Sequence, residues 1–156
     1  MIVRQLQEFL DTQGIKYITI SHSRSFTAQE TAESAHIPKK ELAKVVVIKI
    51  EGKVAMAVIP ASCRVDIDLL KKVVGSDKIE FANEREFKDL FTACEPGAMP
   101  PFGNLYGMDV YVTEELMENK EIVFNAGTHR ELIRMAYKDF ERLVKPEIAK
   151  FCAEIT

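Results

Sequence analysis

The sequence predicts a layered α/β fold, in which helices cover a β-sheet. Two nearly continuous apolar runs, residues 44–50 and 54–59, flank a glycine-containing turn and predict a β-hairpin. Strands that are apolar on both faces are typical of a sheet covered on both sides. With 156 residues the chain can bury one ordinary hydrophobic core, so we expect a single domain spanning residues 1–156.

The N-terminal part of the chain predicts a helix, a strand and a second helix. Residues 3–13 place their apolar side chains on one helical face, and Gly14 is a natural stop. Residues 15–20 are rich in β-branched and aromatic side chains, which favours a strand. After a polar loop, Thr27 and Glu30 form the pattern of a capping box, which predicts a helix through about residue 35.

Two more helix starts follow the hairpin. Asp66 fits the N-cap of a helix over residues 67–74, and Gly75 fits its C-terminal stop. Asn83 and Glu86 form a second capping-box pattern, for a helix that ends near residue 91.

The remaining segments also alternate between strands and helices. In chain order we predict a short strand at 78–82, strands at 108–113 and 121–125 around a turn or short helix at 114–120, a strand or helix at 130–136, a helix at 139–144 and an amphipathic tail helix at 146–155.

Composition limits the possible functions. A net charge of −3 excludes a strongly basic nucleic-acid binder but leaves room for a local basic patch. No apolar run approaches the roughly 20 residues of a membrane helix, and no signal-peptide pattern opens the chain. The three cysteines are widely spaced and contain no Cys-x-x-Cys, so we expect neither a disulfide framework nor a structural zinc site, and a reducing cytoplasm as the compartment.

The stretch from Cys94 to Gly107 is the most unusual part of the sequence. It holds three of the seven glycines and three of the six prolines, which predicts a stiff, irregular loop. Its plain interpretation is a tight connection between strands; its functional interpretation is a ligand-binding loop. Lys44 is also unusual, because it opens an otherwise apolar strand. It either snorkels from the strand end or points its ammonium group into a cleft.

Other chemistries have weaker signals. A thiol mechanism would combine Cys94 with His129, but no Gly-x-Ser-x-Gly elbow supports nucleophilic catalysis. The three histidines have no metal-ligand spacing, and no phosphate loop or dinucleotide fingerprint occurs. We therefore expect no metal and no cofactor.

Three features occur in an order that resembles the YbaK/ProX superfamily. They are Lys44 in its apolar strand, Gly97-x-x-x-Pro101 followed by Phe102-Gly103, and Ala126-Gly127-Thr128-His129. The resemblance covers nearly the whole chain, from His22 and the Phe26–Glu30 segment to Arg134–Phe140 and Pro146. The superfamily comprises trans-editing aminoacyl-tRNA deacylases and the insertion domain of bacterial prolyl-tRNA synthetases.

The resemblance implies a curved, barrel-like mixed sheet surrounded by helices. It also implies hydrolysis of the ester that joins a wrong amino acid to the 3′-terminal ribose of tRNA. The residue most closely tied to activity would be Lys44, and His129 would lie by the aminoacyl group. Gly97 would shape the catalytic loop. The implied substrate-binding residues are Ala98, Met99, Pro100, Pro101, Phe102, Gly127, His22 and Thr27.

Ester hydrolysis needs a positioned water and stabilisation of the developing oxyanion. The amides of Gly97, Ala98 and Met99 can donate to an oxyanion, whereas prolines have no N–H. Lys44 is too basic for a general base unless burial lowers its pKa, so we expect it to hold phosphate or ribose oxygens. The ribose 2′-OH would help to activate the water, as the resemblance suggests.

The sequence departs from the family pattern at one place. Many members follow the lysine with Thr or Asn and then Leu, whereas this chain has Val45 and Val46. A non-catalytic module that binds an amino acid, a nucleotide or a synthetase therefore stays open as the alternative. The expected partners are the 3′ end of mischarged tRNA and an aminoacyl-tRNA synthetase, and the amino acid, the tRNA and the oligomeric state are left open.

Overall fold

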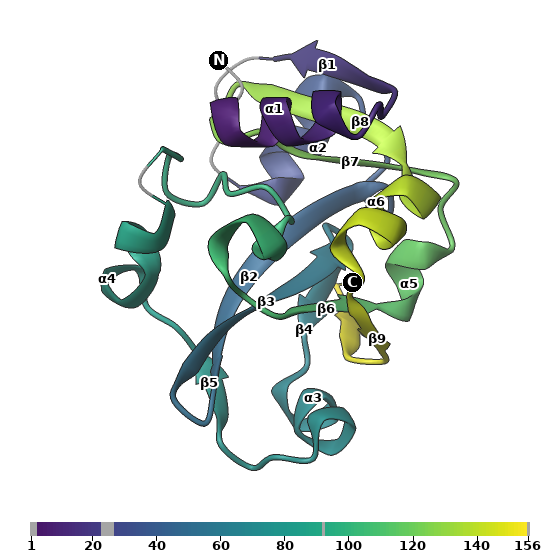
Figure 1. Ribbon diagram of the computed structural model, residues 1–156. Coiled ribbons are helices and arrows are strands. Elements are labelled where there is room, and N and C mark those ends of the chain that lie inside the picture. Colours follow the sequence, from purple (N-terminus) through teal and green to yellow (C-terminus); the bar gives the residue numbers. More distant parts are fainter. Residues whose placement is uncertain (1–2, 23–26, 92, 156) are drawn as a thin grey trace.

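A computed structural model describes residues 3–22, 27–91 and 93–155 (Figure 1). The helices are α1 (Arg4–Thr12), α2 (Ala28–Ala35), α3 (Ile67–Val74), α4 (Glu84–Phe87), α5 (Glu114–Met117) and α6 (Tyr137–Val144), with 3-10 turns η1 (Lys88–Phe91) and η2 (Gly103–Tyr106). The strands are β1 (Tyr17–Ser21), β2 (Leu42–Ile50), β3 (Lys53–Pro60), β4 (Cys63–Val65), β5 (Ile79–Phe81), β6 (Val110–Thr113), β7 (Glu121–Asn125), β8 (Glu131–Ala136), β9 (Glu147–Ala149) and β10 (Cys152–Glu154).

Most of the strands form one mixed sheet in the order β1-β8-β7-β2-β3-β6-β9, and β5 pairs with β2 beside this path. The β1–β8, β8–β7 and β2–β3 pairs are antiparallel, whereas β7–β2, β3–β6 and β6–β9 are parallel. The predicted α/β class and mixed sheet are confirmed. Among the described strands, no pairing is found between the end strands β1 and β9.

The predicted hairpin and helix caps are present. β2 and β3 pair continuously from Ala43–Pro60 to Ile50–Lys53. The side chain of Thr27 accepts a hydrogen bond from the Glu30 amide at the start of α2. The N-caps of α3 and α4 also form as predicted, with the complete capping box between Asn83 and Glu86. These caps satisfy amides that the first helical turn leaves without partners.

Helices cover both faces of the sheet. On one face α1 and α6 pack over β7 and β8, and the main core there includes Leu6, Phe124 and Phe140. On the other face α2 packs against Leu42, Val123 and Leu132, as its place behind the sheet in Figure 1 shows. Side chains of one strand therefore alternate between two cores, as the two-residue period of a strand requires.

The C-terminal segment is not the predicted amphipathic helix. Lys145 takes a left-handed conformation, with φ 52°, and ends α6. The chain then forms β9 beside β6 and β10 beside β4. The buried Phe151 anchors this segment, and its carbonyl accepts a hydrogen bond from the Asp66 amide at 2.8 Å. Tertiary pairing thus outweighs the local helical pattern.

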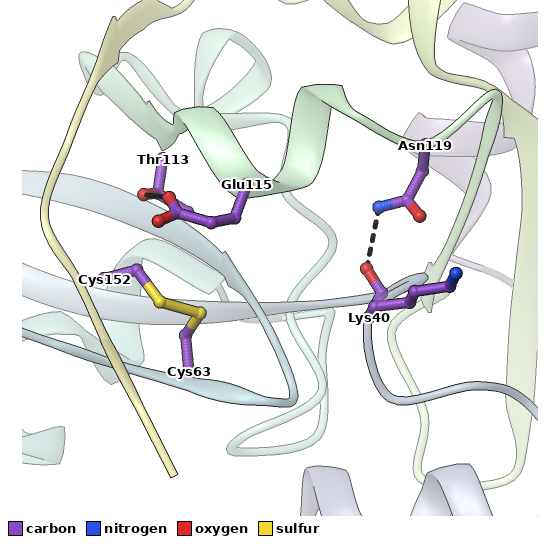
Figure 2. Close-up of a disulfide and its surroundings, with 6 residues drawn as sticks. All are labelled: Lys40, Cys63, Thr113, Glu115, Asn119 and Cys152. Atoms are coloured by element: carbon purple, nitrogen blue, oxygen red, sulfur yellow. Dashed lines mark hydrogen bonds between the residues drawn. A yellow bond between two sulfur atoms is a disulfide. The ribbon is translucent and has the colours of Figure 1, made fainter.

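A disulfide between Cys63 and Cys152 contradicts the expected absence of disulfides (Figure 2). The two residues belong to the antiparallel β4–β10 pair, and their Cα atoms lie 5.5 Å apart. They are separated by 89 positions in the sequence, so no short-range cysteine spacing could have indicated the bond. The pairing depends on the tail strand that the helix prediction missed.

Candidate functional site

The central strand β2 changes its neighbour partway along one edge. Leu42 and Ala43 pair in parallel with Val123 and Phe124 of β7, whereas Ile48–Ile50 pair antiparallel with β5. In the described part of the chain, no strand pairing covers residues 44–46 on this edge, and the Val47 carbonyl already accepts a hydrogen bond from the Ala82 amide after β5 at 3.0 Å. Sites often form where neighbouring strands diverge, because backbone and side chains become accessible there. We call this position the β2 gap.

Lys44 lies at the start of the β2 gap and is half-buried. Because side chains alternate along a strand, Lys44 lies on the same face as Leu42, which packs against α2. The pKa of Lys44 is lowered because burial desolvates the ammonium group. Among the described residues, no hydrogen bond or ion pair to this ammonium is found. A cation in this state favours an anionic or polar ligand.

The glycine–proline loop and the segment that contains His129 are fastened together by hydrogen bonds. The Glu95 amide donates to the Gly127 carbonyl at 2.8 Å, and the Gly127 amide donates to the Ala98 carbonyl at 3.0 Å. The His129 amide donates to Glu95 Oε1 at 2.9 Å. The ring Nε2 of His129 donates to the Pro96 carbonyl at 2.6 Å, so this nitrogen carries a proton. The resulting unit positions residues 95–98 rigidly.

Two glycines of these segments take backbone conformations that favour glycine. Gly97 has φ 83°, and a Cβ atom there would lie 3.4 Å from Cε1 of the His129 ring. Gly127 has φ 104°, and a Cβ atom there would overlap the side chain of Val3. Both φ values lie in the region that favours glycine, so the sequence motif reflects backbone geometry at both positions.

The loop amides differ in their availability. The Ala98 amide donates to the Glu95 carbonyl at 3.0 Å, which contradicts its predicted role as an oxyanion donor. The amides of Gly97 and Met99 donate to no acceptor within the described ranges. Gly97 is exposed, so its amide is the one best placed for a ligand.

The side chains after Gly97 turn into the protein. Ala98, Met99, Pro100 and Pro101 are buried, so their side chains support the loop from beneath. Phe102 is fully buried among the rings of Phe9, Phe124 and Phe140, with ring centroids 6.2, 5.5 and 5.5 Å away. The expected contact of Phe102 with substrate is therefore not available in this structure, because its ring belongs to the core.

His22 and Thr27 flank the segment before α2. The His22 amide donates to the Arg130 carbonyl at 2.9 Å, which brings His22 close to the residue after His129. Thr27 is exposed, and its hydroxyl caps α2. Val45, the residue that departs from the family pattern, packs against the main core. It therefore lies on the face of β2 opposite Lys44.

Cys94 does not form a catalytic pair with His129. Its Sγ lies 3.6 Å from the Tyr106 hydroxyl, and burial raises the pKa of the thiol. A thiol with a raised pKa is a poor nucleophile at neutral pH. The His129 ring is bound to the loop instead, which disfavours the thiol mechanism.

Three hollows of about 430–480 Å³ on the described surface lie away from the loop and the β2 gap. One of about 460 Å³ lies at the far end of the β2–β3 hairpin and is lined by Lys49, Glu51 and Lys78 among others. Its charged residues include the ion pair of Lys49 with Glu80. It shares no residue with the loop or the β2 gap, so we do not assign the chemistry to it.

Comparison with known proteins identifies the family. The model of the aminoacyl-tRNA editing domain matches residues 22–143, which include Lys44, the loop and His129. The chain belongs to the aminoacyl-tRNA editing domain family. This confirms the resemblance found in the sequence.

Relatives of this editing domain include a synthetase and free-standing proteins. A proline–tRNA ligase of Staphylococcus saprophyticus is 29% identical over 131 residues, which span 78% of this chain and 23% of the ligase. The chain thus spans about a quarter of that relative. A solved structure described as a proposed trans-editing enzyme for prolyl tRNA synthetase has a TM-score of 0.82 and 24% identity, covering 97% of this chain and 96% of its own. Another, described only as a hypothetical protein, has a TM-score of 0.86 and 18% identity, covering 96% and 100%.

Sequence reasoning missed two residues near the candidate site. Glu95 binds the backbone of His129 through its side chain, although only its position inside the loop could have indicated this. Asn125 ends β7 immediately before the Ala126-Gly127 turn, and its side-chain oxygen is buried. A polar residue that ends a buried strand next to a motif was the available signal.

Proposed function

We propose that this editing domain is a trans-acting aminoacyl-tRNA deacylase that hydrolyses the ester bond of mischarged tRNA. The observation that supports this most is the half-buried cation Lys44 at the β2 gap, in a domain whose loop is fastened to His129. The whole chain, residues 1–156, would work as one domain in the compartment where translation takes place.

In this proposal Lys44 holds phosphate or ribose oxygens at the 3′ end of the tRNA. A lysine that binds substrate oxygens in this way stays protonated. Lys44 therefore does not act as a general base in this proposal. His129 positions the loop by donating to the Pro96 carbonyl and is not a proton acceptor at Nε2. The catalytic contribution of Gly97 is its exposed amide.

The reaction is a simple hydrolysis. A water molecule attacks the ester carbonyl carbon, and the carbonyl oxygen becomes an oxyanion that loop amides stabilise. The bond between the carbonyl carbon and the ribose oxygen then breaks, and the ribose oxygen takes up a proton. The products are the free amino acid and the uncharged tRNA. The neighbouring 2′-OH helps to orient or activate the water.

Amide stabilisation rests on fewer donors than the sequence suggested. The Ala98 amide is occupied, which leaves the Gly97 and Met99 amides. Removing one oxyanion donor typically costs about 10²–10³ in rate, so two such donors are sufficient for substantial catalysis. The rigid attachment of residues 95–98 to His129 keeps them oriented before the substrate arrives.

The substrate is expected to be a small amino acid on tRNA. A pocket that selects by size rejects larger side chains strongly, but discriminates only ~1–3 kcal/mol against one methylene less. Lys39 and Lys40 are exposed after α2 and would contact the acceptor-stem backbone. Because the chain carries a net charge of −3, binding should be weak and salt-sensitive. The ligase relative supports association with a synthetase.

The proposal is tested with a panel of tRNAs mischarged with alanine, serine, cysteine or threonine. We expect release of at least one of these amino acids, and loss of release in Lys44→Ala. Lys53→Ala is the matched control, because Lys53 is exposed at the other end of the same hairpin. No deacylation of any tRNA, with an active control enzyme in parallel, would refute the proposal.

The alternative is a non-catalytic binding module of the same fold. Val45 instead of a polar residue was the reason to consider it, yet Val45 belongs to the core face of β2. The polar side chain that many members have at this position would therefore not lie on the Lys44 face, where the departure is only an apolar Val46 in place of Leu. Calorimetry that detects binding of a 3′-end analogue without any turnover of the ester would favour the module.

A further inference from the structure

Asn125 is the last residue of β7, and its side chain is in an unusual state. Its Oδ1 atom is buried, and no described residue donates a hydrogen bond to it. A buried carbonyl oxygen without a donor is unfavourable, and such atoms in native proteins usually have a functional reason. The residue as a whole is half-buried, so it lies close to the surface of the site.

The strand register places Asn125 beside Lys44. β2 and β7 pair in parallel as Leu42–Val123 and Ala43–Phe124. The same offset, carried one residue further, brings Lys44 level with Asn125. At the last paired residues the two strands lie about 4.8 Å apart, and Lys44 and Asn125 each lie only one residue beyond that pair.

Asn125 and Lys44 also lie on the same face of the sheet. Asn125 is opposite Leu132 on β8, and residues directly opposite share a face. Leu132 packs with Leu42 in the cluster beneath α2. Since Lys44 alternates with Leu42 along β2, its side chain lies on this face as well.

The two groups are chemically complementary. An ammonium group carries three donors and no acceptor, and the amide oxygen is an acceptor. Neither has a hydrogen-bond partner among the described residues. A rotation of the flexible lysine side chain is sufficient to join them.

Other charged groups on this face are more distant or turned away. Arg134 is opposite Val123 on β8, one strand further from Lys44 than Asn125; it is diagonal to Asn125, and its buried Nε also has no hydrogen-bond partner among the described residues. Glu30 and Glu33 of α2 are exposed. Glu115 accepts a hydrogen bond from Thr113 on the far side of β3. Asn125 is therefore the nearest polar neighbour that the register gives to Lys44.

We infer that Asn125 is a positioning residue for Lys44: its side-chain oxygen accepts a hydrogen bond from the ammonium and directs it into the β2 gap. The role of this pair in editing rests on the proposed function, but the pairing itself does not. Asn125 keeps Lys44 charged and oriented so that the lysine can meet the 3′ end of the tRNA.

The pairing is tested without tRNA, by competitive acetylation of Lys44 with mass-spectrometric readout over a range of pH. The pH dependence gives the pKa of Lys44 separately from its accessibility. Asn125→Leu removes the acceptor at similar volume, so the pKa should fall and acetylation near about pH 8 should be roughly threefold faster. Asn125→Asp should raise the pKa and slow acetylation. Asn104→Leu is the control, because Asn104 is exposed in η2.

An unchanged pKa of Lys44 in both Asn125 variants would overturn the inference. If Asn125→Leu fails to fold, Asn125→Ala, which only truncates the side chain, takes its place. Melting temperatures identify any variant whose fold is disturbed.

The consequence for editing is measured by a double-mutant cycle. Asn125→Leu should lower kcat/KM at least about tenfold, Asn125→Asp should retain most of it, and Asn125→Leu should add nothing in a Lys44→Met background. Additive losses would show that Asn125 does not act through Lys44. If the wild type deacylates no tRNA while the pKa of Lys44 still responds to Asn125, the proposed function fails and the pairing stands. If the wild type is active and neither readout responds, only the inference fails.

Discussion

The Cys63–Cys152 disulfide allows a quantitative prediction about stability. The bond closes a loop between residues 89 positions apart and connects β4 to the C-terminal strand β10. In the chain-entropy model, a loop of this length restricts the unfolded chain by ~15 cal/mol/K, or about 4.6 kcal/mol at 25 °C. This is a large part of the 5–15 kcal/mol that is typical of a domain.

The stabilisation converts into a melting-temperature difference. With roughly 2.1 cal/mol/K of unfolding entropy per residue, a chain of 156 residues has an unfolding entropy of about 0.33 kcal/mol/K. The oxidised protein should therefore melt about 14 °C higher than the reduced protein. Removal of the bond should also loosen the tail, because β9 and β10 are short strands that contribute few contacts of their own.

The assay is thermal unfolding by circular dichroism, with and without a reducing agent, together with thiol titration. The non-reduced protein should show one titratable thiol, Cys94, after denaturation. Cys152→Ser should match the reduced wild type in melting temperature, and Cys94→Ser should leave the difference between the oxidised and reduced forms intact. Three free thiols in the non-reduced protein, or equal melting temperatures in both forms, would refute the reasoning. If the Cys63–Cys152 bond is reduced in a cytoplasm that contains glutathione, its formation depends on the redox state of the compartment.

Three other substitutions give distinct results. Gly127→Ala should cost roughly 2–4 kcal/mol in urea unfolding and reduce deacylation, because φ is 104° and a Cβ would overlap Val3; unchanged stability would contradict this geometry. Phe102→Ala should lower the free energy of unfolding by roughly 3–5 kcal/mol, because it truncates a core side chain. Unchanged stability together with an altered substrate preference would instead show that Phe102 contacts the substrate. Lys44→Met should lower deacylation to a small residual rate and raise the melting temperature at neutral pH. Because burial lowers the pKa of Lys44, the unfolded chain binds its proton more tightly, so wild-type stability should rise with pH between the folded and unfolded pKa values, and Lys44→Met should lack this rise.

The elements that sequence reasoning predicted are those with local signals. The β2–β3 hairpin has a turn glycine and two apolar runs, and the N-caps at Asp66 and Asn83 are fixed within one helical turn. The tail at residues 147–154 lacked such signals, because two strands of three residues each are too short to show a period. Their existence depends on β6 and β4, which lie far away in the sequence.

The order of the motif residues in the sequence indicated the candidate site, whereas the orientation of the loop side chains was not predicted. The roles of Lys44, Gly97 and His129 stay predictions. The hydrogen bonds of His129 to Glu95 and Pro96 explain why the loop and the Ala-Gly-x-His segment occur together. Which loop side chains face inward could not be predicted, since irregular backbone has no period. Phe102 follows the motif directly and yet belongs to the core.

The energetic cost of burying the Lys44 ammonium is consistent with a candidate site at the point where β2 changes its neighbour. A cation in an apolar strand is unfavourable when it is desolvated, and a continuous neighbouring strand would leave it no route to a ligand. At the β2 gap the same cation lies where β2 passes from pairing with β7 to pairing with β5, and in the proposed function a substrate phosphate supplies the missing charge. Residues that serve function at the expense of stability are expected at such sites. Lys44→Met therefore tests both consequences of the buried cation. The variant should gain melting temperature, because the cost of desolvation is removed, and it should lose activity, because the cation that meets the substrate is removed.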